Sequence, residues 1–128
     1  MRSPAAAAAA GLIQTAARPM NFRRISMIRM LAPPGASGEP IAIDCLILPA
    51  PLERHVLKRS SGVPLHGVTV QVVSAEDLVL LKLLRDSDQD RVDIRSLAAS
   101  TRLDRRYLTA RATELRILTR LRKVISTA

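Results

Sequence analysis

Two apolar stretches in the first half of the chain have the character of β-strands separated by a turn. Residues 22–31, FRRISMIRML, are rich in Ile and Met, and residues 41–48, IAIDCLIL, divide their side chains between two apolar faces. The segment between them, APPGASGEP, concentrates Pro, Gly and Ser, which favour turns. The pattern therefore predicts a hairpin that joins the two strands.

Asp44 is the only charged residue within the second of these strands. Side chains alternate along a strand, so Asp44 shares a face with Ala42 and Leu46 and lies opposite the face of Ile43 and Cys45. A carboxylate among apolar neighbours is costly unless another group pairs with it. We therefore expect a partner for Asp44.

The middle of the chain predicts a short helix followed by a second hairpin. PAPLERHVLKRSS, residues 49–61, has Pro51 near its start, where a helix tolerates proline, and is followed by Gly62. VPLHGVTVQVV, residues 63–73, contains two β-branched runs separated by His66-Gly67, a compact turn signal.

The clearest helix signal begins at Ser74 and Asp77, which have the spacing of an N-cap and an acidic N3 residue before an apolar run. Leucine and valine surround Lys82 over residues 78–84, so this helix is expected to be largely buried. Lys82 then needs a carboxylate partner or a path to water. The connector RDSDQD predicts the opening of another helix near residues 90–99.

The C-terminal segment predicts a basic amphipathic helix, or a helix pair, with Asp104 as its N-cap. The elements together predict an α+β fold in which a small mixed or antiparallel sheet packs against C-terminal helices. One domain is expected over residues 21–128, after a disordered Ala-rich segment at residues 1–20. Apolar residues of the C-terminal segment recur at three- and four-residue steps, at Leu108, Ala112, Leu115, Leu118, Leu121 and Ile125.

The composition limits the functions open to this domain. A chain of 128 residues with 48% hydrophobic residues can bury one modest core. Aromatic residues make up only 2%, so platforms for stacking single-stranded bases are scarce. The net charge is +9, and the stretch 101–128 holds eight Arg or Lys against Asp104 and Glu114. Such a stretch forms either solvated helix faces or a surface for phosphates.

Several kinds of active site are excluded by the residues available. The histidines, His55 and His66, lie in no catalytic motif, and the five glycines form no phosphate-binding loop. The single cysteine, Cys45, provides neither a disulfide framework nor a zinc site, and it favours a reducing, cytoplasmic compartment. No apolar run reaches the roughly 18 residues that a membrane span needs. The remaining chemistry lies in Asp44, Lys82 and the acids that follow Lys82.

Four segments carry a resemblance to a known family: IAIDCLIL, PLERHVL, GVTVQVVSAEDLVLLKLLRDSDQDRVDI and LDRRYL. In this order they resemble the later part of nucleotidyltransferase domains of the AbiEii toxin and minimal nucleotidyltransferase type. The resemblance covers about residues 22–110 and is strongest from Gly67 to Ile94. It implies a partial nucleotidyltransferase fold of the DNA polymerase beta kind and a bacterial toxin–antitoxin setting.

The family that this chain resembles transfers a nucleotidyl group from a nucleoside triphosphate (NTP) with Mg²⁺ held by three carboxylates. Two of these lie in an Asp-x-Asp pair after a Gly-Ser, and the third lies on a following strand, a position that Asp44 matches. Residues 1–38 contain no acid, so the Asp-x-Asp pair is missing. One carboxylate cannot hold the two cations of such a site, so we expect no tight Mg²⁺ binding and no activity from the chain as written.

By the same resemblance, Lys82 matches a helical lysine, which implies a contact with the triphosphate. Asp90 and Asp93 match an acidic pair that the resemblance implies to be supporting, structural contacts. The residues alone support a second interpretation equally well, in which Lys82 pairs with one of these acids and holds two helices together.

Three functional hypotheses are compatible with the sequence. The first is a truncated or degenerate nucleotidyltransferase-like protein with an antitoxin protein or RNA as partner. The alternative is a non-catalytic nucleic-acid-binding or protein-interaction module that uses the basic C-terminal helix, with affinity that falls steeply with salt. The third is self-association through a strand edge, which loss of an N-terminal half would expose.

Overall fold

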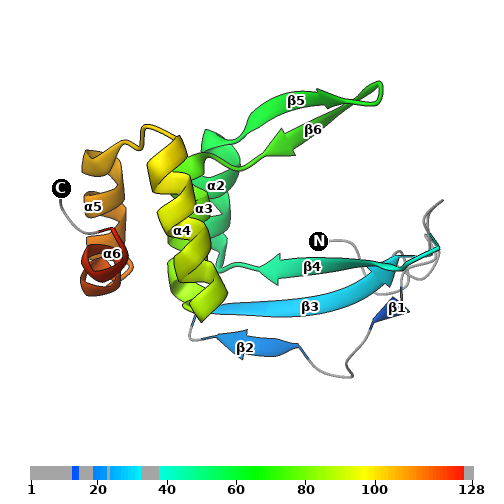
Figure 1. Ribbon diagram of the computed structural model, residues 1–128, viewed down its shortest axis with the longest axis horizontal. Helices are drawn as coiled ribbons and strands as arrows, with labels where there is room; N and C mark the ends of the chain where they lie inside the picture. Colours follow the sequence, from blue (N-terminus) through cyan, green and yellow to red (C-terminus); the bar gives the residue numbers. More distant parts are fainter. Residues whose placement is uncertain (1–12, 15–18, 23, 33–37, 126–128) are drawn as a thin grey trace. The chain divides into compact units, whose positions relative to one another are not determined.

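The structure, a computed structural model, describes residues 13–14, 19–22, 24–32 and 38–125. These residues form an α+β structure with two antiparallel sheets and five helices (Figure 1). The chain divides into two compact units, Met1–Leu48 and Pro49–Ala128. The predicted α+β class with antiparallel pairing is confirmed, and the domain predicted for residues 21–128 spans both units.

The first unit contains a four-stranded antiparallel sheet built around one long strand. Its strands are β1 (Ile13–Gln14), β2 (Met20–Phe22), β3 (Ile25–Ala32) and β4 (Ile41–Ile47). The strands β1 and β2 pair with the two ends of β3, while β4 pairs along the length of β3. The predicted antiparallel pairing of these two strands is therefore confirmed, while residues 33–37 of the predicted turn lie outside the described residues. Most of the segment 1–20 that is predicted to be disordered lies outside the described residues, although β1 falls within it.

The second unit begins with a helix and a two-stranded hairpin. These elements are α2 (Ala50–Arg59), β5 (Ser61–Leu65) and β6 (Val68–Val72). The turn between the strands places His66 at φ 48° and Gly67 at φ 79°. Two successive residues with positive φ match the twist of a two-residue hairpin, as the His66-Gly67 pair predicts.

Four further helices complete the second unit: α3 (Ala75–Arg85), α4 (Asp88–Ser100), α5 (Arg105–Glu114) and α6 (Leu118–Val124). Helix α3 packs against α4 and α5, while α6 packs against α4 and α5. The predicted cap of α3 is present, because the Ser74 hydroxyl accepts a hydrogen bond from the Asp77 N–H at 3.2 Å. Within the described ranges, no helix has the length and apolarity to cross a membrane.

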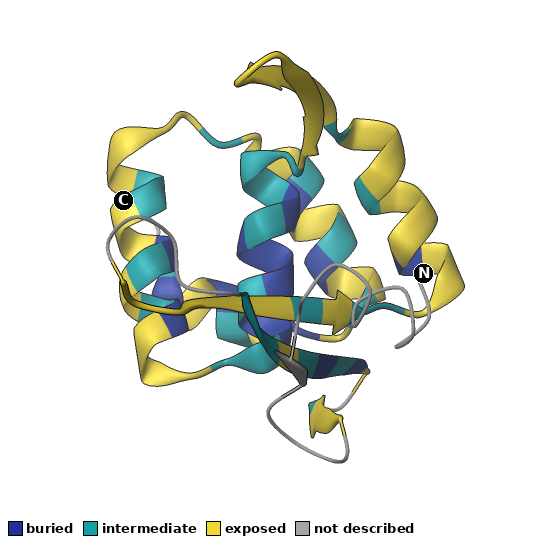
Figure 2. Cartoon of the chain, turned by 90° about the vertical axis from the view of Figure 1, so that its right-hand side faces the viewer, coloured by how far each residue is buried: buried dark blue, intermediate teal, exposed yellow. Residues whose placement is uncertain are grey.

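The core of the second unit lies among its helices. Val79 and Leu83 of α3 are completely buried, as is Ile94 of α4, and Leu108 of α5 is nearly so. Figure 2 shows buried residues within the helices of this unit and the β5–β6 hairpin exposed over its whole length. Full burial of a Leu or Val side chain stabilises a fold by roughly 1.5–3 kcal/mol, so α3 supplies much of the stability of this unit.

The basic C-terminal segment is a helix pair rather than one helix. Helix α5 ends in a Schellman motif, in which the Ile117 N–H bonds to the Ala112 carbonyl and the Arg116 N–H bonds to the Thr113 carbonyl. Arg116 takes the left-handed conformation of this motif, with φ 59°. The break changes which residues face inward. Ile117 and Val124, which lie off the predicted stripe, are buried, while three residues of the stripe are only half-buried: Leu115, Leu118 and Ile125.

Candidate functional site

The junction between α3 and α4 gathers most of the predicted site residues. Helix α3 ends at Arg85, and Asp86 then adopts the left-handed conformation, which turns the chain sharply. Ser87 starts α4 with a complete capping box: its hydroxyl accepts from the Asp90 N–H, and the Asp90 carboxylate accepts from the Ser87 N–H. The Ser-x-x-Asp spacing of this box was visible in the sequence and sets where α4 begins.

Lys82 reaches across this junction to both predicted acids. Its Nζ lies 2.8 Å from Oδ2 of Asp93 and 3.5 Å from Oδ1 of Asp90. Hydrogen bonds from Lys82 and Gln89 hold the pKa of Asp93 below its ordinary value. The structure thus brings Lys82, Asp90 and Asp93 together, and the predicted pairing of the lysine with these acids is present. The ammonium braces α3 against α4.

Asp90 is the most enclosed carboxylate of the junction, with none of its surface exposed. Arg85 donates to both of its oxygens, from Nε at 2.7 Å and from Nη2 at 2.6 Å, and the Ser87 hydroxyl donates at 2.7 Å. Burial alone raises the pKa of Asp90, but the hydrogen bonds from Arg85 and Ser87 outweigh it, so the pKa lies well below the ordinary 3.8. Asp90 is therefore ionised throughout the physiological range.

A second set of ion pairs ties α6 to the same junction. Asp86 accepts from Arg91 of α4 at 2.9 Å and lies 3.6 Å from Arg120 of α6. Arg120 also donates to the backbone carbonyl of Leu83 at 2.8 Å. The junction therefore has alternating acidic and basic groups whose charges largely satisfy one another, which is typical of a structural brace.

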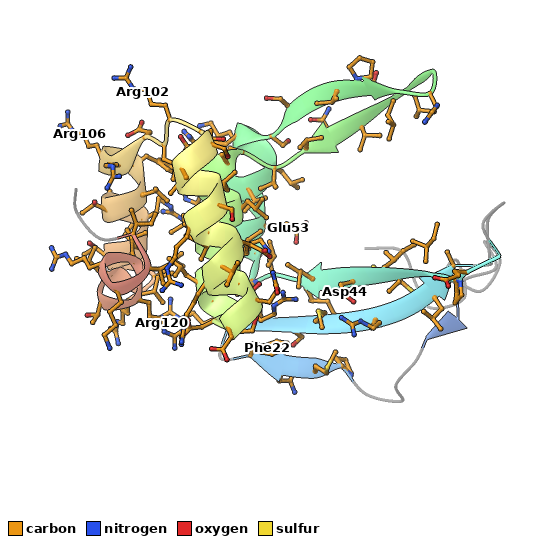
Figure 3. All side chains as sticks on the ribbon, viewed as in Figure 1. Phe22, Asp44, Glu53, Arg102, Arg106 and Arg120 are labelled. Carbon is orange, nitrogen blue, oxygen red and sulfur yellow. The ribbon has the colours of Figure 1, made fainter. Side chains whose placement is uncertain are left out.

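Asp44 lies on β4 in the first unit (Figure 3), directly across the strand pair from Arg29. Arg29 donates to both of its oxygens, from Nε at 2.7 Å and from Nη2 at 2.9 Å. This two-point contact is the geometry in which guanidinium binds carboxylate most strongly. The partner that Asp44 was expected to need is therefore Arg29, which the strand register could have revealed once β3 and β4 were aligned.

The donor groups around Asp44 do not fit a pair of divalent cations. A guanidinium already neutralises both of its carboxylate oxygens. Among the residues that the structure describes, no group of three or more His, Cys, Asp or Glu is placed to hold a metal ion. Mg²⁺ favours near-octahedral oxygen ligation, and a two-metal site needs several carboxylates. The described residues thus offer no such ligand set.

A cluster that the sequence did not single out surrounds Asp77 at the start of α3. Asp77 is 1% exposed and accepts a hydrogen bond from the Tyr107 hydroxyl at 2.6 Å. Its other oxygen, Oδ2, makes no hydrogen bond and lies 3.7 Å from Nε of Arg59. The Arg59 guanidinium also stacks on the Tyr107 ring, 3.7 Å from its centroid. These contacts join the ends of α2, α3 and α5.

Burial, followed by the hydrogen bond to Asp77, raises the pKa of Tyr107 to about 12. The phenol therefore stays protonated and acts as a donor. No spacing rule predicts this cluster, because its three members lie on separate helices. The only signal was an acid at the N3 position of a buried helix.

Exposed positive charge is concentrated on the last two helices and on the connections beside them. Arg102 and Arg106 extend away from the helices around the start of α5 (Figure 3). Within the described part of the chain, no ion pair engages six exposed basic residues of this segment: Arg102, Arg105, Arg106, Arg116, Arg122 and Lys123. We call these six residues the basic surface.

The sequence matches a family described as "Nucleotidyltransferase of unknown function (DUF6036)" over residues 51–123, more than half of the chain. The match covers nearly all of α2 and α6 and the whole of the hairpin, α3, α4 and α5, and it does not include Asp44. No curated protein and no solved structure matches the chain.

Proposed function

Because this chain belongs to the DUF6036 family of nucleotidyltransferases of unknown function, we propose that it is a nucleotidyltransferase-like protein whose described residues form scaffold rather than a self-sufficient metal site. The finer assignment, to the AbiEii toxin type, is also a proposal. It is supported by the order of a strand with Asp44, a helix, a hairpin and the Ser74-capped helix with Lys82.

The contact between Arg29 and Asp44 is the observation that carries this proposal. A cation that replaces Arg29 must break two charge-assisted hydrogen bonds and still lacks further carboxylates. Asp44 therefore acts as a cross-strand partner that holds β3 to β4. A nucleotidyl-transfer reaction requires additional acidic ligands beyond those described.

Titration with Mn²⁺ followed by NMR tests this role of Asp44. Paramagnetic broadening reports which amides lie near a bound ion. We expect no selective broadening of residues 41–47 at micromolar Mn²⁺, and the same result for Asp44→Asn. Selective broadening of these amides in the wild-type chain, abolished in Asp44→Asn, would overturn the proposal.

The brace role of Lys82 is better supported than the triphosphate contact that the resemblance implies. Its ammonium is already engaged by Asp93 and Asp90, and the Lys82 side chain is only 21% exposed. A double-mutant cycle separates the two roles, since contacting residues are non-additive. We expect Lys82→Met and Asp93→Asn each to lower the melting temperature, with little further loss in the double variant.

Lys58→Met, on the exposed face of α2, is the matched control and should leave the melting temperature nearly unchanged. If Lys82→Met instead abolishes ATP binding without any change in the melting temperature, Lys82 contacts the triphosphate and does not act as a structural brace.

The partners implied by the resemblance are also proposals: an NTP, and an antitoxin protein or RNA. A cytoplasmic location is proposed from the single cysteine, Cys45, which suits a reducing compartment. Self-association through a strand edge is a further proposal. It is supported by β4, which among the described residues pairs only with β3.

Binding of nucleic acid by the basic surface is the second candidate function. Exposed cations without acidic partners are available to neutralise phosphates and to release counterions. The basic surface lies on α5, on α6 and on the connections before and after α5. Asp104 caps α5, and Glu114 is engaged by Arg111. The segment therefore has a clear excess of positive charge.

Fluorescence anisotropy with labelled RNA and DNA duplexes, over a series of salt concentrations, tests this candidate. We expect log affinity to fall linearly with log salt. The magnitude of this slope should be smaller in the double variant Arg102→Gln/Arg106→Gln. The reduction should be roughly 0.9 for each DNA phosphate that the variant no longer neutralises. Arg54→Gln/Lys58→Gln, on the exposed face of α2, is the control of equal charge change. Binding that is absent, insensitive to salt or equally weakened by both pairs contradicts the candidate.

A further inference from the structure

The β5–β6 hairpin has one face that is apolar except for Ser61 at its open end. Residues directly opposite each other in an antiparallel pair share a face, and the register pairs Val63 with Val70 and Leu65 with Val68. Val72, opposite Ser61, lies on the same face. The face so formed, which we call the hairpin face, consists of Val63, Leu65, Val68, Val70 and Val72.

The apolar residues of the hairpin face are exposed. Val68 is 63% exposed and Leu65 is 55% exposed, and every residue of both strands is exposed. A two-stranded hairpin without a packing partner is marginally stable in water. A contiguous apolar patch of this kind on an ordered element marks an interaction site.

The opposite face has a different character. It carries Gly62, Pro64, Thr69 and Gln71, the last of which contacts the Ser60 hydroxyl. An apolar face against a polar one is the pattern of a strand pair that packs on one side and meets water on the other. The asymmetry therefore identifies the hairpin face as the side that is covered.

Charge indicates what covers it. The chain carries a net charge of +9, yet residues 60–75 contain no Asp, Glu, Lys or Arg. The hairpin face therefore offers no cation that could bind an acidic partner or a phosphate backbone. Two copies of the chain can meet there without bringing charged side chains into contact, since the five apolar residues of one copy pack on the same five residues of the other.

We propose that two copies of this chain associate by packing their hairpin faces against each other about a twofold axis. The contact is isologous, because the same residues of each copy face one another, so it closes at a dimer. Two five-residue strands cover less than the roughly 800 Å² per partner of a standard stable interface. The dimer is therefore weak and forms progressively with concentration, in the micromolar to millimolar range.

Sedimentation velocity of the full chain over this concentration range tests the proposal. We expect the weight-average mass to rise from 14.0 kDa towards twice that value. Val70→Lys places a charge at the centre of the hairpin face and should keep the chain monomeric. Thr69→Lys, the neighbouring residue on the polar face, is the matched control and should associate as the wild type does.

NMR chemical shifts recorded over the same concentrations locate the contact, with circular dichroism to show that both variants fold. We expect the concentration-dependent shifts to be confined to residues 61–72. A wild-type chain that stays monomeric at millimolar concentration overturns the proposal. Equal weakening by Val70→Lys and Thr69→Lys, or shifts on β4 instead of the hairpin, also overturns it. None of these outcomes depends on metal or nucleotide binding, so the proposed function is tested separately.

Discussion

At the scale of single residues, three carboxylates of this chain are held by specific partners. Asp44 is paired with Arg29, Asp90 with Arg85, and Asp77 with Tyr107. The sequence predicted that Asp44 and Lys82 need partners, because burial of an isolated charge is costly. It could not name Arg29 or Tyr107, since strand register and helix packing bring these groups together.

Asp90→Asn is expected to lower the free energy of unfolding by about 2 kcal/mol near neutral pH, because it leaves the Arg85 guanidinium without its buried carboxylate. Urea unfolding followed by circular dichroism measures this loss. Asp88→Asn, two residues earlier in the same helix turn, is fully exposed and should change the stability by less than about 0.5 kcal/mol. A similar effect of both substitutions would contradict the assigned role of Asp90.

The cost of Asp90→Asn should also depend on pH. The folded-state pKa of Asp90 is depressed, so its contribution to stability is complete above the unfolded pKa of 3.8 and is lost progressively as the pH falls below that value. The wild type and Asp90→Asn should therefore converge in stability in acid. A difference that stays constant down to pH ~2 would show that ionisation of Asp90 does not matter for folding.

Tyr107 is the only tyrosine, so ultraviolet absorbance reports its ionisation directly. We expect a midpoint near pH 12 in the folded chain, compared with the ordinary 10.0. Asp77→Asn should lower the midpoint only in part, because burial, the larger cause, remains. Glu76→Gln changes a neighbouring carboxylate that does not accept from the phenol and should leave it unchanged. A wild-type midpoint near 10 would contradict the Tyr107–Asp77 contact.

At the scale of elements, most of the second unit could be predicted from local sequence signals. Ser74 and Asp77 marked the start of α3, and His66-Gly67 marked the hairpin turn. The break between α5 and α6 was left open, because Arg116 replaces the glycine that usually signals a Schellman motif. The buried positions of Ile117 and Val124 followed from that break and were missed.

The same substitution at two nearby arginines should therefore have opposite effects. Arg116→Gly relieves a left-handed conformation that costs a residue with a side chain roughly 1 kcal/mol, so it should raise the melting temperature. Arg122→Gly lies inside α6 and should lower stability by about 1 kcal/mol, since glycine is a poor helix former. Thermal unfolding of both variants is the measurement. A loss of stability from Arg116→Gly would show that the motif is not formed in solution.

At the scale of the whole molecule, the α+β class and the nucleotidyltransferase-like character were predicted, and the family match supports them. The predicted role of Asp44 as a metal ligand stays a prediction, because the matched segment begins after it. The division into two compact units could not be predicted, since no linker composition marks the boundary at Leu48. Helix packing in the second unit follows from buried leucines, whereas the sheet of the first unit depends on long-range pairing.

Isothermal titration calorimetry of the full chain with ATP and Mg²⁺ tests the central claim most directly. A chain that holds Asp44 against Arg29 and offers no further cluster of carboxylates among its described residues should show no binding in the micromolar range. A micromolar site that requires both Mg²⁺ and Asp44, and that disappears in Asp44→Asn, would show instead that this chain assembles a metal–nucleotide site of its own.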